Sequence, residues 1–184
     1  MIESMNTRKK IEADLMELKR MVYRMGRLSG EALDRAVWAL KERDIAAAEA
    51  VLEKDDMIDD LEDEVDNACM EFAARYQPLG EDLRVVTSIM HIAVDLERIG
   101  DYGGNIAKVA IELADKEPIK PLIDIPCMVE KINMMLNTSL IAIDTHSPET
   151  AVSVFHMDDD VDDLEKQIMR ELFVMVMEKP ERIE

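Results

Sequence analysis

Apolar and small residues recur at steps of three and four along the first forty positions of the chain. They are Ile11, Leu15, Leu18, Val22, Met25, Ser29, Ala32, Ala36 and Ala39. This period is that of an amphipathic α-helix, whose apolar stripe faces a core. The pattern predicts one long first helix, and the small residues in its second half allow another helix to approach closely.

A second helix is predicted after Asp44, which is a suitable N-cap residue. Its inner stripe consists of Ala48, Val51, Asp55, Ile58, Glu62, Val65, Cys69, Phe72 and Tyr76. Two of these positions carry carboxylates where a core side chain is expected. Pro78 and Gly80 then interrupt the chain, and Asp82 is a suitable cap for a third helix over residues 83–115.

The third helix also has an apolar stripe, but it contains several glycines. Its inner positions are Val85, Ile89, Ile92, Leu96, Ile99, Ile106 and Leu113. Gly100, Gly103 and Gly104 each cost a helix roughly 0.5–1 kcal/mol relative to Ala, and we interpret them as close contacts with the first helix. Three long helices joined by short turns predict an antiparallel bundle and an all-α fold.

Prolines separate this bundle from the rest of the chain. Pro118, Pro121 and Pro126 lie within KEPIKPLIDIP, which cannot be helical throughout. Residues 117–126 are therefore the expected linker. A fourth helix follows and ends near Asp144, and a fifth begins at Ser147 and Pro148 as cap and first-turn residue and stops at Pro180.

The chain contains an internal repeat with a constant shift of 103 residues. The acidic segment Asp55, Asp56, Asp59, Asp60, Leu61, Glu62 recurs as Asp158, Asp159, Asp162, Asp163, Leu164, Glu165. The shift also pairs Leu33 with Leu136 and Ala39 with Ala142. We expect two related domains, residues 1–116 and 127–184; the second is incomplete, with two helices, because the sixth helix would begin at residue 184.

The charge of the chain limits its partners. Forty-one acidic and 22 basic side chains give a formal net charge of −19. Such a surface repels nucleic acid and anionic lipid headgroups and opposes direct binding of phosphate-bearing ligands. We see no phosphate-binding GxxxxGK[ST] loop, no apolar run that could cross a bilayer and no secretory signal. A cytoplasmic protein that binds cations is expected.

Two pairs of carboxylates have the spacing of one helical turn. Asp55 and Asp59 form one pair, and Glu97 and Asp101 form the other. If the second and third helices are antiparallel neighbours, the pairs converge into an oxygen-rich site for Mg²⁺, Mn²⁺, Ca²⁺ or iron. A solvated acidic face is the alternative. His156 is a weaker candidate ligand because it lies two residues before Asp158.

The segment from Asp95 to Lys108, DLERIGDYGGNIAK, resembles the signature of the PhoU family. EKDDMIDDLE and HMDDDVDDLE resemble the companion motif of that family. The resemblance implies a tandem of antiparallel three-helix bundles that hold iron, zinc, magnesium or manganese. Its implied metal ligands are Asp55, Asp59, Glu97 and Asp101 for the first site, with Asp158 and Asp162 as half of the second.

The resemblance also implies a non-enzymatic role. Members of the family act as negative regulators of phosphate uptake and phosphate-starvation signalling. The implied partners are the ATPase subunit of the phosphate ABC transporter and a sensor histidine kinase, so that contact with the membrane is indirect. We expect a homodimer. An acidic helical scaffold or a chaperone-like interaction protein without a metal site remains the alternative.

Two other classes of metal protein do not fit the sequence. A carboxylate-bridged di-iron enzyme requires Glu-x-x-His pairs, and none of the three histidines has a glutamate three positions before it. An EF-hand calcium loop requires a glycine at its turn, and DDMIDDLEDEVD has none.

Overall fold

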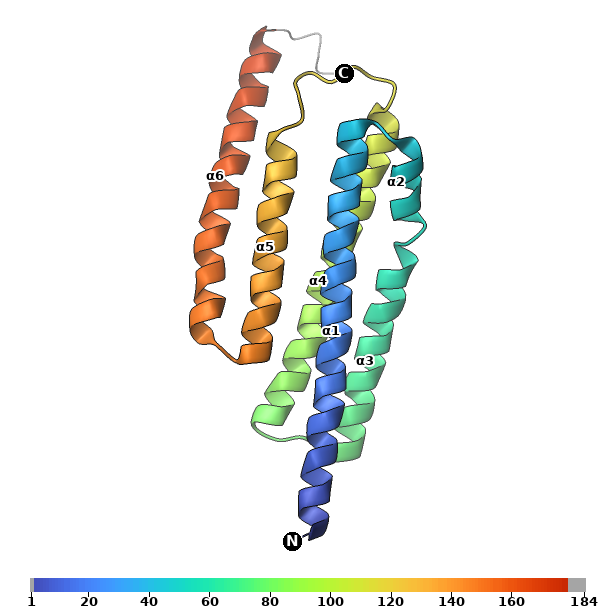
Figure 1. Ribbon diagram of the computed structural model, residues 1–184, viewed down its shortest axis with the longest axis vertical. Helices are drawn as coiled ribbons and strands as arrows, with labels where there is room; N and C mark the ends of the chain where they lie inside the picture. The colour runs from blue at the N-terminus through green and yellow to red at the C-terminus, as the bar shows by residue number, and fades with distance from the viewer. Residues whose placement is uncertain (1, 179–184) are drawn as a thin grey trace.

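The computed structural model describes the backbone of residues 2–178 and the side chains of residues 7–178. This part of the chain contains six helices and no strand, which confirms the all-α class. In order they are α1 (Ile2–Glu42), α2 (Ile45–Leu52), α3 (Asp56–Tyr76), α4 (Glu81–Leu113), α5 (Asp124–Thr145) and α6 (Pro148–Glu178) (Figure 1).

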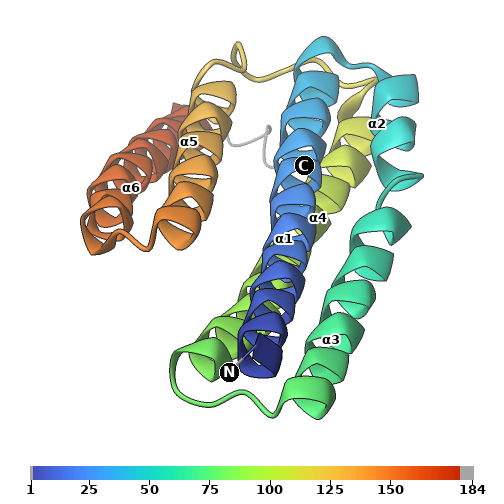
Figure 2. The same cartoon turned by 60° about the horizontal axis from the view of Figure 1, so that its bottom comes forward.

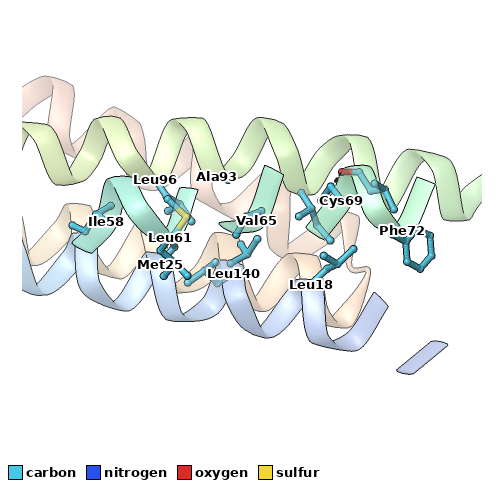
Figure 3. Close-up of a cluster of buried hydrophobic side chains, with 13 residues drawn as sticks. Leu18, Met25, Ile58, Leu61, Val65, Cys69, Phe72, Ala93, Leu96 and Leu140 are labelled. Atoms are coloured by element: carbon cyan, nitrogen blue, oxygen red, sulfur yellow. Dashed lines mark hydrogen bonds between the residues drawn. The ribbon is translucent and has the colours of Figure 1, made fainter. Parts of the chain in front are cut away.

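The first bundle consists of α1, α3 and α4, with the short α2 packed on α1 and α4 near one end. Apolar side chains from the three long helices meet along its axis (Figure 3). Met25 of α1, Val65 of α3 and Ile89 of α4 are among its fully buried side chains. The predicted stripe of α1 is confirmed, because Leu18 and Ala36 also lie in the core.

The second helix is interrupted, contrary to the expectation of one continuous helix after Asp44. Asp44 caps α2 as expected, since its Oδ1 accepts the Ala47 N–H at 3.0 Å. Residues 53–55 then form a turn in which the N–H groups of Lys54 and Asp55 reach carbonyls only three residues back. The break places Asp56 and Asp59 in the first turn of α3.

The prediction of where the third helix begins was also wrong in detail. Gly80, with a φ of 60°, occupies the N-cap position, and Asp82 lies inside α4 without capping it. Instead, Asp82 accepts a hydrogen bond from Arg8 at 2.6 Å. The buried face of α4 includes small residues that were not predicted to be inside, such as Ala93 and Ala107. Leu113, which was predicted to be inside, is 40% exposed.

Two of the three glycines in α4 do not lie at the contact with α1, where we expected all three. A Cβ at Gly103 would lie 3.0 Å from Ala32, so this glycine does allow α1 to approach. A Cβ at Gly100 would instead meet Ile58 of α3 at 2.7 Å. Gly104 faces a carboxylate, which is described below with the candidate site.

The second part of the chain consists of α5 and α6 after a non-helical segment at residues 114–123. Ser147 caps α6 as expected, because its Oγ accepts the Thr150 N–H at 3.1 Å. α5 runs antiparallel to α1 and packs against it (Figures 1 and 2). Within the described residues, α6 packs against α5 alone.

Glycines permit the contact between α1 and α5. A Cβ at Gly26 would lie 2.7 Å from Leu140, and one at Gly30 would lie 2.7 Å from Asn133. The Tyr23 hydroxyl donates to the Leu140 carbonyl at 2.7 Å. The first bundle and the α5–α6 pair are therefore joined by direct contact between these two helices.

The helix boundaries agree with the internal repeat. α1 ends at Glu42 and α5 at Thr145, which are separated by the repeat shift. α2 begins at Ile45 and α6 at Pro148, again one shift apart. In the second repeat, however, the helix that follows the shared turn is continuous, whereas the first repeat contains the α2–α3 break.

Candidate metal centre

Three of the predicted ligands come together between α3 and α4. Asp59 of α3 and Glu97 and Asp101 of α4 each offer one carboxylate oxygen, and these three oxygens lie within 4.8 Å of one another. Glu97 and Asp101 share a face of α4 because they are one turn apart. Asp59 reaches them because α3 packs antiparallel to α4 after a short connection at residues 77–80.

The centre lies at the surface of the bundle. Glu97 is half-buried, and Asp59 and Asp101 are exposed. One side of the site is therefore open to water and ions, while the core residue Ile58 lies directly before Asp59 in the chain.

The carboxylates of this centre repel one another. Partial burial raises the pKa of Asp59, and the negative charge of Asp101 raises it further. The pKa of Glu97 is raised by burial, then by Asp101 and Asp59. A raised carboxyl pKa means that the folded protein disfavours the charged form. A bound cation would relieve this repulsion.

Asp55, the fourth predicted ligand of this site, lies beside the group of three. It is located in the break between α2 and α3, and a Cβ at Gly104 would lie 2.8 Å from its Oδ2 atom. Gly104 thus leaves room for the Asp55 carboxylate against the backbone of α4. Burial raises the pKa of Asp55, as do Asp101 and Asp59, whereas Lys108 lowers it.

Glu62, which was not among the predicted ligands, also lies near the centre. Burial raises its pKa, followed by the charges of Asp63, Asp66 and Asp59. Glu62 in turn raises the pKa of Glu97. The signal that could have identified it is its position three residues after Asp59, on the same side of α3.

The structure does not bring the predicted residues of the second site into a comparable group within the described chain. Asp158 and Asp162 are exposed on α6, and Asp162 lies 3.8 Å from the Lys166 ammonium. His156 is exposed on the same helix. The physical reason is that, among the described helices, α6 packs on α5 alone, so no third helix brings carboxylates to this face.

The donor set of the centre fits a hard cation. Asp59, Glu97 and Asp101 supply oxygen alone, and Mg²⁺ and Mn²⁺ prefer such ligands. Iron also accepts carboxylates, whereas structural zinc sites favour cysteine and histidine. No helix of the described chain has the length and apolar character needed to cross a membrane.

Comparisons with known proteins agree with the repeat and the fold. The PhoU domain model matches residues 22–110 and 125–184, and the two matches begin one repeat shift apart. A phosphate-specific transport system accessory protein PhoU homolog of Aquifex aeolicus is 40% identical over 174 residues, which cover 95% of this chain and 79% of that protein. Its counterpart in Clostridium acetobutylicum is 35% identical over 178 residues, with 96% and 81% covered.

Two crystal structures resemble this fold over most of its length. PhoU from Pseudomonas aeruginosa superposes with a TM-score of 0.87 at 33% identity, covering 94% of this chain and 83% of that one. The phosphate transport system regulatory protein PhoU from Streptococcus pneumoniae gives a TM-score of 0.84 at 27% identity, with 92% and 80% covered. The family resemblance of the sequence motifs is confirmed, and this chain belongs to the PhoU family.

Proposed function

We propose that this chain is a metal-binding adaptor that restrains phosphate uptake and phosphate-starvation signalling. Its partners would be the ATPase subunit of the phosphate ABC transporter and a sensor histidine kinase, both contacted on the cytoplasmic side by a homodimer. The names of its relatives support this role: one is an accessory protein of the phosphate-specific transport system and another a regulatory protein of phosphate transport.

The observation that carries the metal-binding part is the meeting of Asp59, Glu97 and Asp101. An ion held by these three carboxylates would join α3 to α4, and Asp55 would extend the ligand set into the break after α2. The ion would thus stabilise one arrangement of three helices. An adaptor benefits from this effect because its activity depends on the shape of its surface.

The proposed ligands keep the division into two repeats. Asp55, Asp59, Glu97 and Asp101 form the first site in residues 1–116, and residues 117–126 link it to the second repeat. Asp158 and Asp162 in residues 127–184 would be half of a second site. Magnesium, manganese or iron suits the oxygen ligands of the first site better than zinc does.

Metal binding is tested with neighbouring residues of one helix. Asp59→Asn removes a proposed ligand, and Asp60→Asn removes the same charge from an exposed neighbour outside the group of three. The purified proteins are loaded with Mn²⁺ or Fe²⁺, desalted and analysed for metal by mass spectrometry. We expect Asp59→Asn to lose metal and Asp60→Asn to retain it. Equal retention would contradict the assignment.

Regulation is tested in cells that lack the gene. We expect deletion to raise phosphate uptake and starvation-gene expression in phosphate-rich medium, and the wild-type gene to restore repression. The ATPase subunit should co-purify with the wild-type protein. If the double variant Glu97→Gln/Asp101→Asn restores repression fully, the ion is not needed for regulation. Normal repression in the deletion strain, together with no ATPase complex, would leave the scaffold alternative.

A further inference from the structure

A pocket with an apolar lining and several polar side chains lies where α1, the start of α4 and the end of α5 meet. It has a volume of about 290 Å³. Its polar lining consists of Lys19 from α1, Glu81, Arg84 and Ser88 from α4, and His146 after α5. Arg84 precedes Glu97 by 13 residues on α4, which corresponds to about 20 Å along the helix axis. The pocket is therefore distinct from the candidate metal centre.

The charge of this pocket is opposite to that of the chain. The protein has 41 acidic and 22 basic side chains, yet Lys19, Arg84 and His146 face a single carboxylate here, that of Glu81. The Lys19 ammonium donates a hydrogen bond to the His146 Nε2 atom at 3.2 Å. Among the described residues, Arg84 takes part in none of the ion pairs. Lys19 is also absent from these ion pairs, so neither cation has an ion-pair partner in the described chain.

The backbone fixes the histidine at the mouth of the pocket. His146 is the C-cap of α5 and adopts a left-handed conformation with a φ of 51°. The backbone N–H of His146 donates a hydrogen bond to the Ala142 carbonyl, which holds the turn in place. The pocket is thus assembled from both repeats, because Lys19 and Arg84 belong to the first repeat and His146 to the second.

We propose that this pocket binds a phosphate group, either as inorganic phosphate or as part of a small phosphate monoester. Arg84 can donate a pair of hydrogen bonds to two oxygens, and Lys19 and Ser88 can donate to the others, while His146 positions the Lys19 ammonium. Apolar side chains such as the buried Ile89 also line the pocket, whereas Arg84, Ser88 and His146 are exposed at its opening.

Glu81 gives the pocket a means to choose phosphate over sulfate. An ionised carboxylate can only accept hydrogen bonds. Hydrogen phosphate carries a P–O–H group that can donate to Glu81, whereas sulfate at neutral pH carries no proton and would be repelled. The volume of about 290 Å³ exceeds that of a bare oxyanion, so it also admits water or an organic substituent.

This inference goes beyond the proposed function, since it requires neither the metal ion nor a protein partner. It departs from the expectation that the net charge opposes direct binding of phosphate-bearing ligands. Net charge determines the electrostatic potential far from the protein surface, whereas the groups that line a pocket determine which ligand binds within it.

The test is calorimetric titration of the full chain after treatment with a chelator, so that no bound metal can hold the anion. Inorganic phosphate, phenyl phosphate and sulfate are compared at pH 7 and constant ionic strength. We expect saturable binding of one phosphate per chain and binding of sulfate weaker by about tenfold or more. Glu81→Gln should reduce the difference in affinity between phosphate and sulfate. Tighter binding of phenyl phosphate would identify an ester as the ligand, and equal or weaker binding would identify inorganic phosphate.

Variants that each remove one positive charge distinguish binding in the pocket from general electrostatic attraction of phosphate to the protein. Arg84→Gln and Lys19→Gln should each weaken phosphate binding by about tenfold or more. Arg98→Gln removes the same charge from an exposed position on α4 and should leave binding unchanged. Helical circular dichroism verifies that the variants fold. Absence of saturable binding to the wild-type chain, an equal loss in Arg98→Gln, or sulfate bound as tightly as phosphate would overturn the proposal.

Discussion

Asn133 is the counterpart of Gly30 in the second repeat, and the two residues contact each other: the Asn133 Nδ2 atom lies 3.5 Å from the Gly30 carbonyl oxygen. Equivalent residues meet in this way when two copies of a unit are related by a two-fold axis that passes between them. The repeats therefore pack on each other through the same face, and glycine in one repeat makes room for asparagine in the other.

The contacts on either side of this pair follow the same symmetry. Leu140 packs over Gly26, and their counterparts Val37 and Val129 share an apolar cluster. α1 and α5 thus present equivalent surfaces to each other, with side chains of complementary size at paired positions.

Gly30→Ala should weaken the contact between the repeats. The added Cβ would lie 2.7 Å from the Asn133 Oδ1 atom, so that Asn133 must move and its 2.7 Å hydrogen bond to Asp34 is strained. We expect the free energy of unfolding to fall by about 1–3 kcal/mol, as for other overpacked contacts. Urea denaturation measures the change. The double variant Gly30→Ala/Asn133→Ala should recover part of the loss, and failure to recover would contradict a clash with Asn133.

Asp34 should make the stability of this interface depend on pH. Burial raises the pKa of Asp34, the Asn133 hydrogen bond lowers it, and Glu130 and Glu31 raise it. Because the net shift is upward, the contribution of Asp34 to stability is full below its unfolded pKa, near 3.8, and is lost as pH rises through the folded pKa. Asp34→Asn keeps the shape without the charge. It should raise the urea midpoint at pH 7, with a smaller gain near pH 4.

The control for this prediction is Asp159→Asn, which removes one charge from an exposed position of α6. If both variants change the midpoint by the same amount at pH 7, general charge repulsion accounts for the effect, and Asp34 has no special role.

Gly104 and Gly103 should respond differently to substitution by alanine. Gly104→Ala would displace the Asp55 carboxylate, which lies 2.8 Å from the added Cβ. It should reduce metal retention while improving helix propensity by up to about 1 kcal/mol. Gly103→Ala would press on the backbone of Ala32 at 3.0 Å and should destabilise the fold by about 1–3 kcal/mol. Metal analysis and thermal unfolding of both variants check this. Full metal retention in Gly104→Ala would exclude Asp55 as a ligand.

A divalent cation should stabilise the metal-free protein. At a free Mn²⁺ concentration of about 100 times the dissociation constant, binding to one site adds about 2.7 kcal/mol. For a chain of this size, each kcal/mol raises Tm by about 2–4 °C. Differential scanning calorimetry should show the rise in wild type and none in Glu97→Gln/Asp101→Asn. Without metal, this double variant should melt no lower than wild type, because it lacks two mutually repelling carboxylates.

The features of the fold that sequence could predict depend on neighbours in the chain. Asp44 and Ser147 mark helix starts because a cap bonds an N–H three residues away. Asp82 has the same local signal, but its carboxylate pairs with Arg8, which is 74 residues distant. The break at residues 53–55 was missed because helical spacing continues through it in the sequence.

The site was predictable to the extent that helical spacing determines it. Glu97 and Asp101 share a face of α4 whatever their surroundings, and the short connection at residues 77–80 brings α3 alongside. The place of Asp55 depends on the break and on the room left by Gly104, neither of which follows from periodicity. The pocket lined by Lys19, Arg84 and His146 could not be predicted, because these residues are far apart in the sequence and meet only through the contact of α1 with α5.

The single packing partner of α6 has a consequence for the motions of the native protein. Helices that bury few contacts open at lower free energy than the global unfolding transition, and their amide protons exchange sooner with solvent. In the described chain α4 is held by α1, α2 and α3, whereas α6 rests on α5 alone. We therefore expect the amide protons of α6 to exchange with solvent before those of the first bundle, which carries the carboxylate centre.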